Sequence, residues 1–317
     1  MRLSSRLLSA AVLLAAASPL TARANAPMVK TQAPGFFRFM LGSFEVTVIS
    51  DGTVKLPMSK LLAGKAEKTA ATFKKAFLGD PVETSDNAYL VNTGTKLVLI
   101  DTGAGGLFGP TLGSLNANLK AAGYTPEQVD EIYITHAHPD HIGGLTVNGA
   151  LAFPNATLRL DQADLDFWLD DAKLKAAPED SKGFFQGAQA MLKPWVDAKK
   201  VSTFTGATEL VPGVKAQPSH GHTAGHTTYV VESDGQKLVL WGDLMHAAAI
   251  QFPDPSVTIA FDTDRKAAAA QRKKAYADAA KNGYLVGVTH VSFPGVGHVR
   301  TEGKGYEWMP INYTSLK

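Results

Sequence analysis

The alternation of apolar and polar positions predicts several short strands joined by turns. Residues 44–49 alternate and stop at Asp51-Gly52, a turn signal. Two apolar runs, 89–91 and 97–100, flank Asn92-Thr93-Gly94-Thr95, a spacing that predicts a hairpin. Further runs rich in apolar and β-branched residues predict strands at 132–134, 227–231, 238–241 and 285–288.

Helical periodicity lies between these runs. The three ranges that carry it are 111–122, 161–174 and 264–281. The first range places Leu112, Leu115 and Leu119 on one face, and the last is rich in alanine and ends at Asn282-Gly283. Because strands and helices are interleaved along the chain, we expect an α/β or α+β layered fold.

Several predicted strands stop directly on polar residues. These residues are Asp101, Thr135-His136, Gly242-Asp243 and Thr289-His290. A layered fold exposes its chemistry in the loops that follow rigid strand ends. Four such ends therefore predict a shared rim that carries the functional site.

The N-terminal residues have the pattern of a secretory signal peptide. Arg2 and Arg6 precede an apolar run at 7–20, which is followed by small-residue cleavage patterns around 24–26. The run is too short to span a bilayer, and no other segment is long enough to do so. We expect residues 1–26 to be removed and the mature chain to be exported, to the periplasm, without a membrane anchor.

Removal of this segment changes the charge balance. It contains Arg2, Arg6 and Arg23 and no acid, so 31 basic and 29 acidic residues become 28 and 29. A near-neutral chain without a basic stripe does not favour nucleic acid as a partner. Residues 27–317 suit a single domain, and the absence of cysteine excludes disulfides and thiolate ligands.

Histidines are concentrated at one position in the chain. Of nine histidines, His136, His138 and His141 lie within six residues, together with Asp140. Pro139 and the glycines after it indicate a loop that enters a helix, from which imidazoles can reach more than one ion. A histidine-rich turn without ligand function is the alternative, which three histidines and an aspartate at this spacing disfavour. Imidazole and carboxylate ligands suit zinc, manganese, cobalt or iron, and zinc is the default for hydrolysis.

The motifs resemble those of the metallo-β-lactamase superfamily. The matching segments are Thr-His-x-His-x-Asp-His at 135–141, Gly-His-Thr-x-Gly-His at 221–226, Gly242-Asp243 and the late His290. Segments 97–103, 107–113 and 292–295 further resemble the branch formed by methyl parathion hydrolases and related lactonases and arylesterases. The resemblance implies an αββα sandwich, two mixed β-sheets flanked by helices, and a homodimer.

The same resemblance implies two divalent metal ions and assigns their ligands. One ion takes His136, His138 and His222, the other takes Asp140, His141 and His290, and Asp243 bridges both. Two adjacent cations lower the pKa of a shared water from about 16 toward neutrality, and Asp140 and Asp243 would orient that water or receive its proton. Asp101 would hold a ligand imidazole in place, with a turn cap as the alternative.

The expected substrate pocket is aromatic. The resemblance places Phe108, Trp168 and one residue of the pair Phe184 and Phe185 around an aromatic leaving group, and the pair is expected in a glycine-flanked loop. Ordinary core packing is the alternative interpretation of these residues. Four positions depart from the methyl parathion hydrolase pattern, and these are Leu61, His246, Ile259 and Phe261.

Ile259 and Phe261 are bulkier than in that pattern, His246 replaces an aliphatic residue and Leu61 replaces a basic one, so a bulky, partly polar wall narrows the pocket. A planar lactone or aryl ester would fit it more easily than a tetrahedral phosphotriester. The sequence thus favours a lactonase or arylesterase of dihydrocoumarin type with weak phosphotriesterase activity. Alternatives are an organophosphate hydrolase, a β-lactamase, an acyl-homoserine lactonase and a non-catalytic metal-binding protein of the envelope.

Overall fold

The computed structural model describes residues 26–316. The predicted signal peptide lies outside the described residues except for Ala26, so export stays a prediction. Every helix and strand named below lies in one compact unit, Pro34–Lys317. Among the described helices, none combines the length and apolar character that a membrane span requires.

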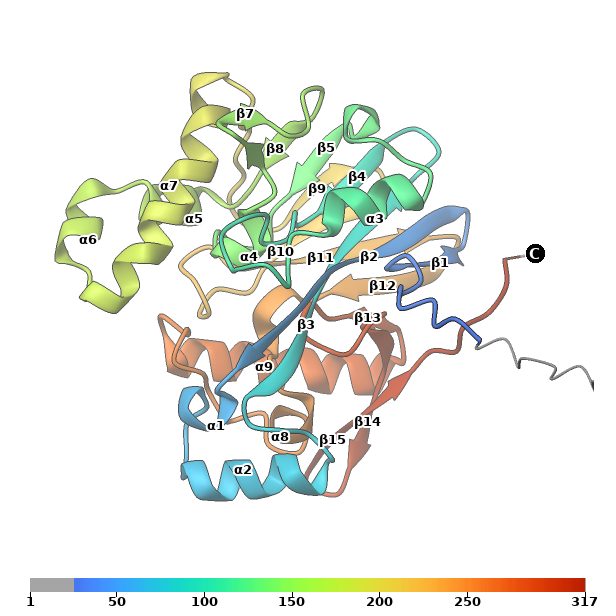
Figure 1. Ribbon diagram of the computed structural model, residues 1–317, viewed down its shortest axis with the longest axis vertical. Coiled ribbons are helices and arrows are strands. Elements are labelled where there is room, and N and C mark those ends of the chain that lie inside the picture. Colours follow the sequence, from blue (N-terminus) through green and yellow to red (C-terminus); the bar gives the residue numbers. More distant parts are fainter. Residues whose placement is uncertain (1–25, 317) are drawn as a thin grey trace, which may run out of the picture. The chain divides into compact units, whose positions relative to one another are not determined.

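The first sheet has six strands in the order β1-β2-β3-β4-β5-β8 (Figure 1). Their bounds are β1 Phe36–Leu41, β2 Phe44–Leu56, β3 Val82–Asn92, β4 Leu97–Ile100, β5 Glu131–Tyr133 and β8 Thr157–Arg159. The hairpin predicted at 92–95 is confirmed, because β3 and β4 pair antiparallel with Asn92 opposite Leu97. Strand β2 continues past the predicted turn at Asp51-Gly52, because an irregularity between Ser50 and Gly52 absorbs the extra residue.

The second sheet has seven strands in the order β15-β14-β13-β12-β11-β10-β9. Their bounds are β9 Thr208–Val211, β10 Val214–Pro218, β11 Thr227–Ser233, β12 Gln236–Leu240, β13 Leu285–Gly287, β14 Val296–Glu302 and β15 Gly305–Pro310. Strands β12 and β13 are parallel, and the other pairs are antiparallel. A small hairpin joins β6 Thr146–Val147 to β7 Ala150–Leu151.

Helices cover the outer faces of the two sheets. Their bounds are α1 Met58–Leu61, α2 Ala66–Lys75, α3 Leu115–Ala121, α4 Pro139–Ile142, α5 Gln162–Trp168, α6 Asp171–Ala176, α7 Lys182–Asp197, α8 Ala248–Gln251 and α9 Arg265–Asn282. Short 3-10 turns lie at Pro126–Gln128, Glu179–Ser181 and Gly242–Leu244. The outer face of the first sheet packs against α3, α5 and α7, and that of the second packs against α9.

A separate apolar core fills the space between the sheets. Val48, Tyr89 and Val98 of the first sheet meet Tyr229 and Leu238 of the second, and all of these side chains are buried. With helices outside both sheets, the layers are α, β, β and α (Figure 1). The predicted sandwich is confirmed.

The helices show where sequence signals succeed and fail. Helix α9 matches its prediction, since the Asp264 side chain accepts from Ala267 N–H at its start and Gly283 adopts a left-handed conformation at its end. The range 161–174 is split into α5 and α6, with Asp170 capping the second helix. Helix α3 starts only at Leu115, because Gly113 at φ 89° interrupts the predicted range.

One prediction about the pocket region is wrong. Phe184 and Phe185 lie in helix α7, not in a glycine-flanked loop. The glycines lower helix propensity, but α7 buries Phe185, Leu192 and Trp195 against the first sheet. Burial of that apolar face outweighs the local propensity.

Candidate metal centre

The predicted rim exists at the edge where the two sheets meet. Asp101 and His136 follow β4 and β5, which are parallel neighbours in the first sheet. Asp243 and His290 follow β12 and β13, which are parallel neighbours in the second sheet. Parallel neighbours end at the same edge of a sheet, so each pair of loops is brought together.

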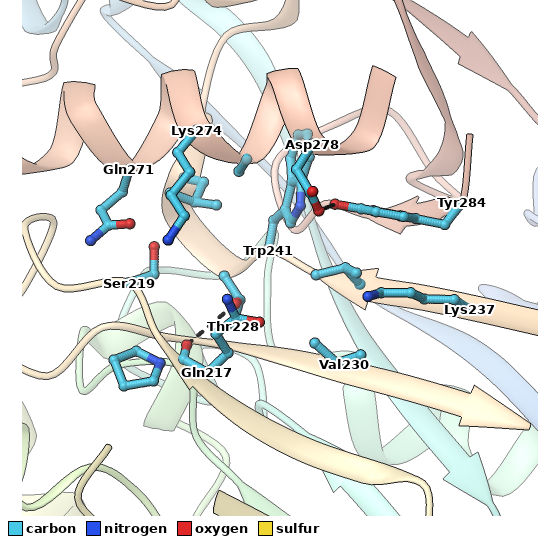
Figure 2. Close-up of a pocket in the computed structure, with 14 residues that line it drawn as sticks. Gln217, Ser219, Thr228, Val230, Lys237, Trp241, Gln271, Lys274, Asp278 and Tyr284 are labelled. Carbon is cyan, nitrogen blue, oxygen red and sulfur yellow. Dashed lines mark hydrogen bonds between the residues drawn. The ribbon is translucent and has the colours of Figure 1, made fainter. Parts of the chain in front are cut away.

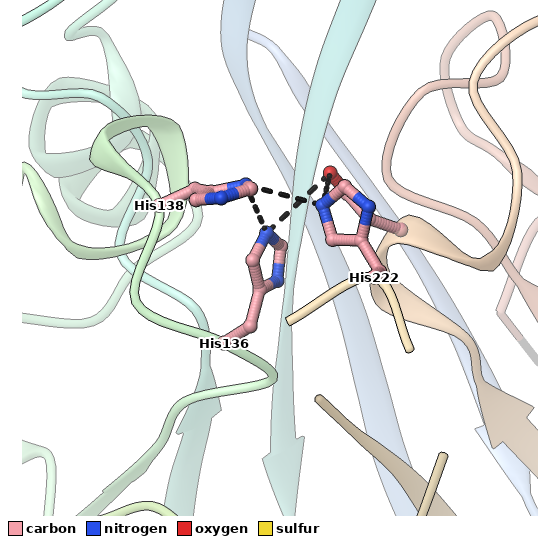
Figure 3. Close-up of side chains that lie close together, drawn as sticks. His136, His138 and His222 are labelled. Carbon is pink, nitrogen blue, oxygen red and sulfur yellow. Dashed lines mark hydrogen bonds and ion pairs between the residues drawn. The ribbon is translucent and has the colours of Figure 1, made fainter. Parts of the chain in front are cut away.

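The first group of candidate ligands consists of His136, His138, His222 and Asp243. Their ligand atoms all lie within 4.8 Å of one another, and all four residues are buried. Figure 3 shows the three imidazoles pointing toward one another from two separate loops. His138 Nδ1 lies 3.0 Å from His136 Nε2 and 3.1 Å from His222 Nε2. Nitrogen atoms at such distances suit a shared cation.

The second group consists of Asp140, His141 and His290, and Asp243 joins it to the first. Asp243 Oδ1 lies 3.1 Å from Nε2 of both His141 and His290. Asp243 Oδ2 lies 3.3 Å from His222 Nε2 and 3.5 Å from His136 Nε2. One carboxylate oxygen therefore faces each group, the arrangement that a bridging ligand needs.

In three of these histidines, the ring nitrogen that points away from the centre, Nδ1, lies within hydrogen-bond distance of a neighbouring acceptor. His141 Nδ1 lies 2.8 Å from Asp101 Oδ2, and His222 Nδ1 lies 2.9 Å from Asp262 Oδ1. His290 Nδ1 lies 3.0 Å from the Ser85 carbonyl oxygen. Such acceptors fix the tautomer and direct each Nε2 at the centre. Asp101 thus makes the contact that the sequence predicted, whereas Asp262 and Ser85 carry no sequence signal.

Burial and charge affect these groups differently. Burial lowers the pKa of His136 and His138 well below the usual range. Both imidazoles are therefore neutral and can offer a nitrogen lone pair to a metal ion. Burial also acts to lower the pKa of His290, but the Asp243 and Asp140 carboxylates outweigh it and raise that pKa to about 9. For Asp243, burial acts to raise the pKa, yet facing histidines, His290 first, hold it well below its usual value.

Unmatched polar atoms complete the test for a metal. Asp243 Oδ1 and His141 Nε2 are buried and, although 3.1 Å apart, are not aligned for a hydrogen bond, and neither atom has another hydrogen-bond partner within the described residues. Orphaned buried polar atoms are costly, and a divalent cation would match both. The donor set and its geometry therefore fit metal binding.

An aromatic wall borders the first group. The Phe184 and Trp168 rings lie 5.1 Å and 5.3 Å from the His138 ring. Phe261 lies 6.0 Å from Phe184 and 6.3 Å from His246 and so links the two. Phe184 is the member of the phenylalanine pair that contacts the centre, because Phe185 is buried against Trp168 at 4.8 Å.

The other predicted pocket residues have more varied surroundings. Leu61 and Ile259 pack in the same apolar cluster as Phe261. Phe108 is half-buried in a loop that approaches the metal loop at its glycines, where a Cβ on Gly105 would lie 2.1 Å from the Gly143 carbonyl oxygen. Among the described aromatic pairs, none includes Phe108.

His246 lies inside the centre. Its Nε2 is 3.0 Å from Asp243 Oδ2, and its ring stacks on His290 at 5.2 Å. His246, His290 and Asp243 also bring their ligand atoms within 4.8 Å of one another. By contrast, His220 is half-exposed beside Asp161, so His222 is the histidine of that pair that joins the cluster.

Comparison with known proteins matches this geometry. The family model described as the metallo-beta-lactamase superfamily matches residues 82–290. The chain belongs to the metallo-β-lactamase superfamily. Its buried histidine and aspartate groups are those of a metal-dependent hydrolase.

Two solved structures are similar over nearly the whole chain. A hydrolase named AbOPH is 35% identical, with a TM-score of 0.85, over 90% of this chain and 100% of its own. AidC, described as a dizinc quorum-quenching lactonase in complex with a product, is 30% identical, with a TM-score of 0.82, over 89% and 99%. Ribonuclease TTHA0252 of Thermus thermophilus is 30% identical over 55% of this chain and 38% of its own length. The present chain therefore matches well under half of that ribonuclease.

Two cavities differ in their relation to the metal centre. A cavity of about 390 Å³ reaches His246 and His290 and is otherwise mostly apolar, with Phe73, Phe293 and Trp308 in its wall. A second, of about 150 Å³, lies between α9 and the outer face of the seven-stranded sheet (Figure 2). Its lining contains none of the candidate ligands. Of these two cavities, only the first reaches the metal centre.

His226 supports the candidate ligand Asp243, a contact that sequence reasoning missed. Its Nδ1 donates to the Ser219 carbonyl oxygen, and its Nε2 accepts the Asp243 N–H, both at 3.1 Å. Burial lowers its pKa to about 3, so the ring stays neutral and can keep both bonds. It therefore holds the backbone of Asp243 in place. Its position at the end of Gly-His-Thr-x-Gly-His was the available signal.

Proposed function

We propose that this hydrolase uses two zinc ions to cleave lactones and aryl esters of dihydrocoumarin type, with weak phosphotriesterase activity. The main observation behind this proposal is the position of the Asp243 carboxylate. Its two oxygens face the two ligand groups and lie 3.1–3.5 Å from histidine Nε2 atoms. When bound, the ions would activate a water near neutral pH and polarise the ester carbonyl. The likeness to AidC, described as a dizinc lactonase, supports both the metal and the substrate class.

Two carboxylates of the chain, Asp243 and Asp140, have different roles in this proposal. Asp243 is almost fully buried and directs both oxygens at histidines, so its function is to hold the centre together. The Asp140 side chain is 19% exposed, which makes it the ligand best placed to take up a proton and pass it to solvent. Proton transfer by such a positioned group contributes roughly 100- to 10,000-fold to a rate.

The surroundings of the centre favour a flat substrate. Phe184 and Phe261 offer ring faces beside His138 and His246, against which an aromatic acyl or leaving group can pack. Ile259 and His246 are both buried, and their bulk would leave less room for the alkoxy arms of a phosphotriester. A planar bicyclic lactone avoids that conflict.

An N-acyl homoserine lactone is the second candidate substrate. The observation that favours it is the 30% identity to AidC over 89% of this chain, since AidC is described as a quorum-quenching lactonase. The mostly apolar cavity beside His246 and His290 could receive an acyl chain.

A substrate panel tests the proposal. On zinc-loaded enzyme, we expect kcat/KM for dihydrocoumarin to exceed that for methyl parathion at least about tenfold, roughly 1.4 kcal/mol in transition-state binding. N-hexanoyl homoserine lactone serves as the third arm. Faster turnover of methyl parathion would make the protein an organophosphate hydrolase, and no turnover of any ester would favour a metal-binding protein.

The substitution His246→Leu tests the pocket within the same panel. It removes the imidazole that contacts Asp243 Oδ2, and we expect the ratio of methyl parathion to dihydrocoumarin kcat/KM to rise. The matched control is His220→Leu, the same change at a half-exposed histidine outside the cluster. Equal ratios in both variants would show that His246 does not set the preference.

A further inference from the structure

A buried carboxylate on helix α5 joins two loops of the metal centre. Asp164 is 1% exposed. Its Oδ2 accepts the N–H of Ala137 and its Oδ1 accepts the N–H of Gly225, both at 2.7 Å. Ala137 lies between His136 and His138, and Gly225 lies three residues after His222. One side chain thus connects the backbones of both loops that supply the first ligand group.

The second of these loops is seated directly on the helix. A Cβ on Gly225 would lie 2.6 Å from Asp164 N and 3.0 Å from Asp161 Cβ, so only glycine permits this approach. On the same helix, one turn further, the Trp168 ring faces His138 at 5.3 Å. Short bonds from N–H groups to a carboxylate are charge-assisted and stronger than bonds between neutral groups. The helix therefore acts as a rigid base for the first group.

The second ligand group is oriented by different contacts. His141 is held by Asp101 through Nδ1, and its carbonyl oxygen accepts from Thr102 N–H at 2.8 Å. His290 is held by the Ser85 carbonyl oxygen. These contacts come from β3 and from the loop after β4, not from α5. The side chains that orient the two ligand groups therefore lie on different elements, while Thr135, whose Oγ1 lies 3.1 Å from His136 Nδ1 and 3.3 Å from His141 Nδ1, contacts both groups.

We propose that Asp164 is a positioning residue for one metal position only, the position formed by His136, His138 and His222. Loss of its carboxylate would let the two loops separate and weaken metal binding there. Metal bound by Asp140, His141 and His290 would be affected much less. This selectivity rests on the proposed two-metal centre.

The test measures zinc affinity at one position at a time. His290→Ala leaves the first group as the intact site, and His222→Ala leaves the second. Into each background Asp164→Asn is introduced, which places an amide donor against a backbone N–H. Zinc affinity is measured by competition with a chelator of known Kd. We expect Asp164→Asn to raise the zinc Kd about 10- to 100-fold in the His290→Ala background, the range seen for groups that orient metal ligands, and less than about threefold in the other.

Asp161→Asn is the matched control. Asp161 is also buried and caps the start of α5, where it accepts from Ala163 N–H at 2.8 Å, but it accepts no hydrogen bond from Ala137 or Gly225. It should destabilise the helix without selective loss of zinc. Cobalt(II) absorption spectra provide a second measurement, because a distorted first group shifts the ligand-field bands whereas a loss of stability alone does not.

The possible outcomes are distinct. Equal weakening in both backgrounds, unchanged affinity in both, or an equal effect of Asp161→Asn would overturn the role of Asp164. If Asp164→Asn does not fold, Asp164→Glu, which keeps the charge but displaces the oxygens, is measured against the same expectations. A wild type that binds one zinc would refute the two-metal proposal, while the effect of Asp164→Asn on that zinc would still decide the role of Asp164.

Discussion

Single histidines of the centre differ in charge because their neighbours differ. Burial leaves His136, His138 and His226 neutral, whereas facing carboxylates raise the pKa of His290 to about 9. Neutral imidazoles can bind a metal, or accept an N–H, without first losing a proton. The same residue type therefore serves as ligand at some positions and as a hydrogen-bonded support at His226.

The pKa of His226 predicts an acid-sensitive fold. It is about 3 in the folded protein and about 6.5 in an unfolded chain. Between these values the unfolded state binds more protons, so stability is full above about pH 6.5 and is lost as pH falls toward 3. The slope from this one residue is at most about 1.4 kcal/mol per pH unit.

His226→Gln isolates this contribution, since glutamine supplies a donor and an acceptor but does not titrate. Urea unfolding of the zinc-free proteins at pH 6.5 and 4.5 should show that the variant loses about 2 kcal/mol less than the wild type. Parallel losses would mean that the His226 pKa is not lowered by burial in the fold.

Individual site residues were predictable from the sequence where they belong to a local motif or directly follow a predicted strand. The histidine run and the later strand-end residues do converge in the structure, and Asp101 does contact His141. Asp164, Asp262 and Ser85 could not be found in this way. Each of the three contacts a histidine, or the backbone beside one, that is distant from it in the sequence, so no local pattern connects the two partners.

At the scale of secondary-structure elements, the conformation of the loop 101–114 depends on the irregularity in strand β2 between Ser50 and Gly52. Asp51 is fully buried there and accepts the N–H groups of Ala104, Gly113 and Leu115 at 2.8–2.9 Å. Burial raises its pKa, and the three N–H groups oppose that shift. One aspartate thus shapes the loop that carries Phe108.

Replacement of this anchor should loosen the loop. Asp51→Asn leaves at least one buried N–H facing an amide donor, so we expect a loss of about 1–3 kcal/mol in unfolding free energy. Amides near 104–115 should also exchange faster with deuterium. The control is Asp130→Asn, the same change at a half-exposed aspartate that accepts a single N–H, from Leu97. Similar losses in both variants would contradict the special role of Asp51.

Elements were predictable when their signals were local. Helix α9 has an aspartate at its start and a left-handed glycine at its end, and both are visible in the sequence. Helix α7 was missed because Gly183 and Gly187 lower the helix propensity of its sequence. Its apolar face is accounted for only by the first sheet, against which it packs. Tertiary burial decided that element.

On the scale of the whole molecule, the centre lies where the two sheets meet and its groups come from both. The first sheet contributes the loop after β5, and the second contributes the residues after β12 and β13. A metal bound there would link the two sheets across the rim. Homodimer formation stays a prediction, based on resemblance to the family.

Metal removal should therefore destabilise the entire fold. A metal at 1,000 times its Kd stabilises the native state by about 4 kcal/mol, and 1 kcal/mol corresponds to roughly 2–4 °C in Tm for a chain of this size. We expect EDTA to lower the Tm by about 10 °C and to abolish ester hydrolysis, and zinc to restore both. An unchanged Tm together with lost activity would show that the metal does not link the sheets.

The amino-acid sequence determined which ligand types are available and on which strand ends they lie, because histidine spacing, strand periodicity and turn residues are local properties. It also excluded thiolate chemistry, since there is no cysteine. Only the tertiary structure decided that Phe184 contacts the centre while Phe185 fills the core, and that Asp164 joins two loops 88 residues apart, from Ala137 to Gly225. Such contacts depend on how two sheets and their helices pack, and packing is a property of the whole chain.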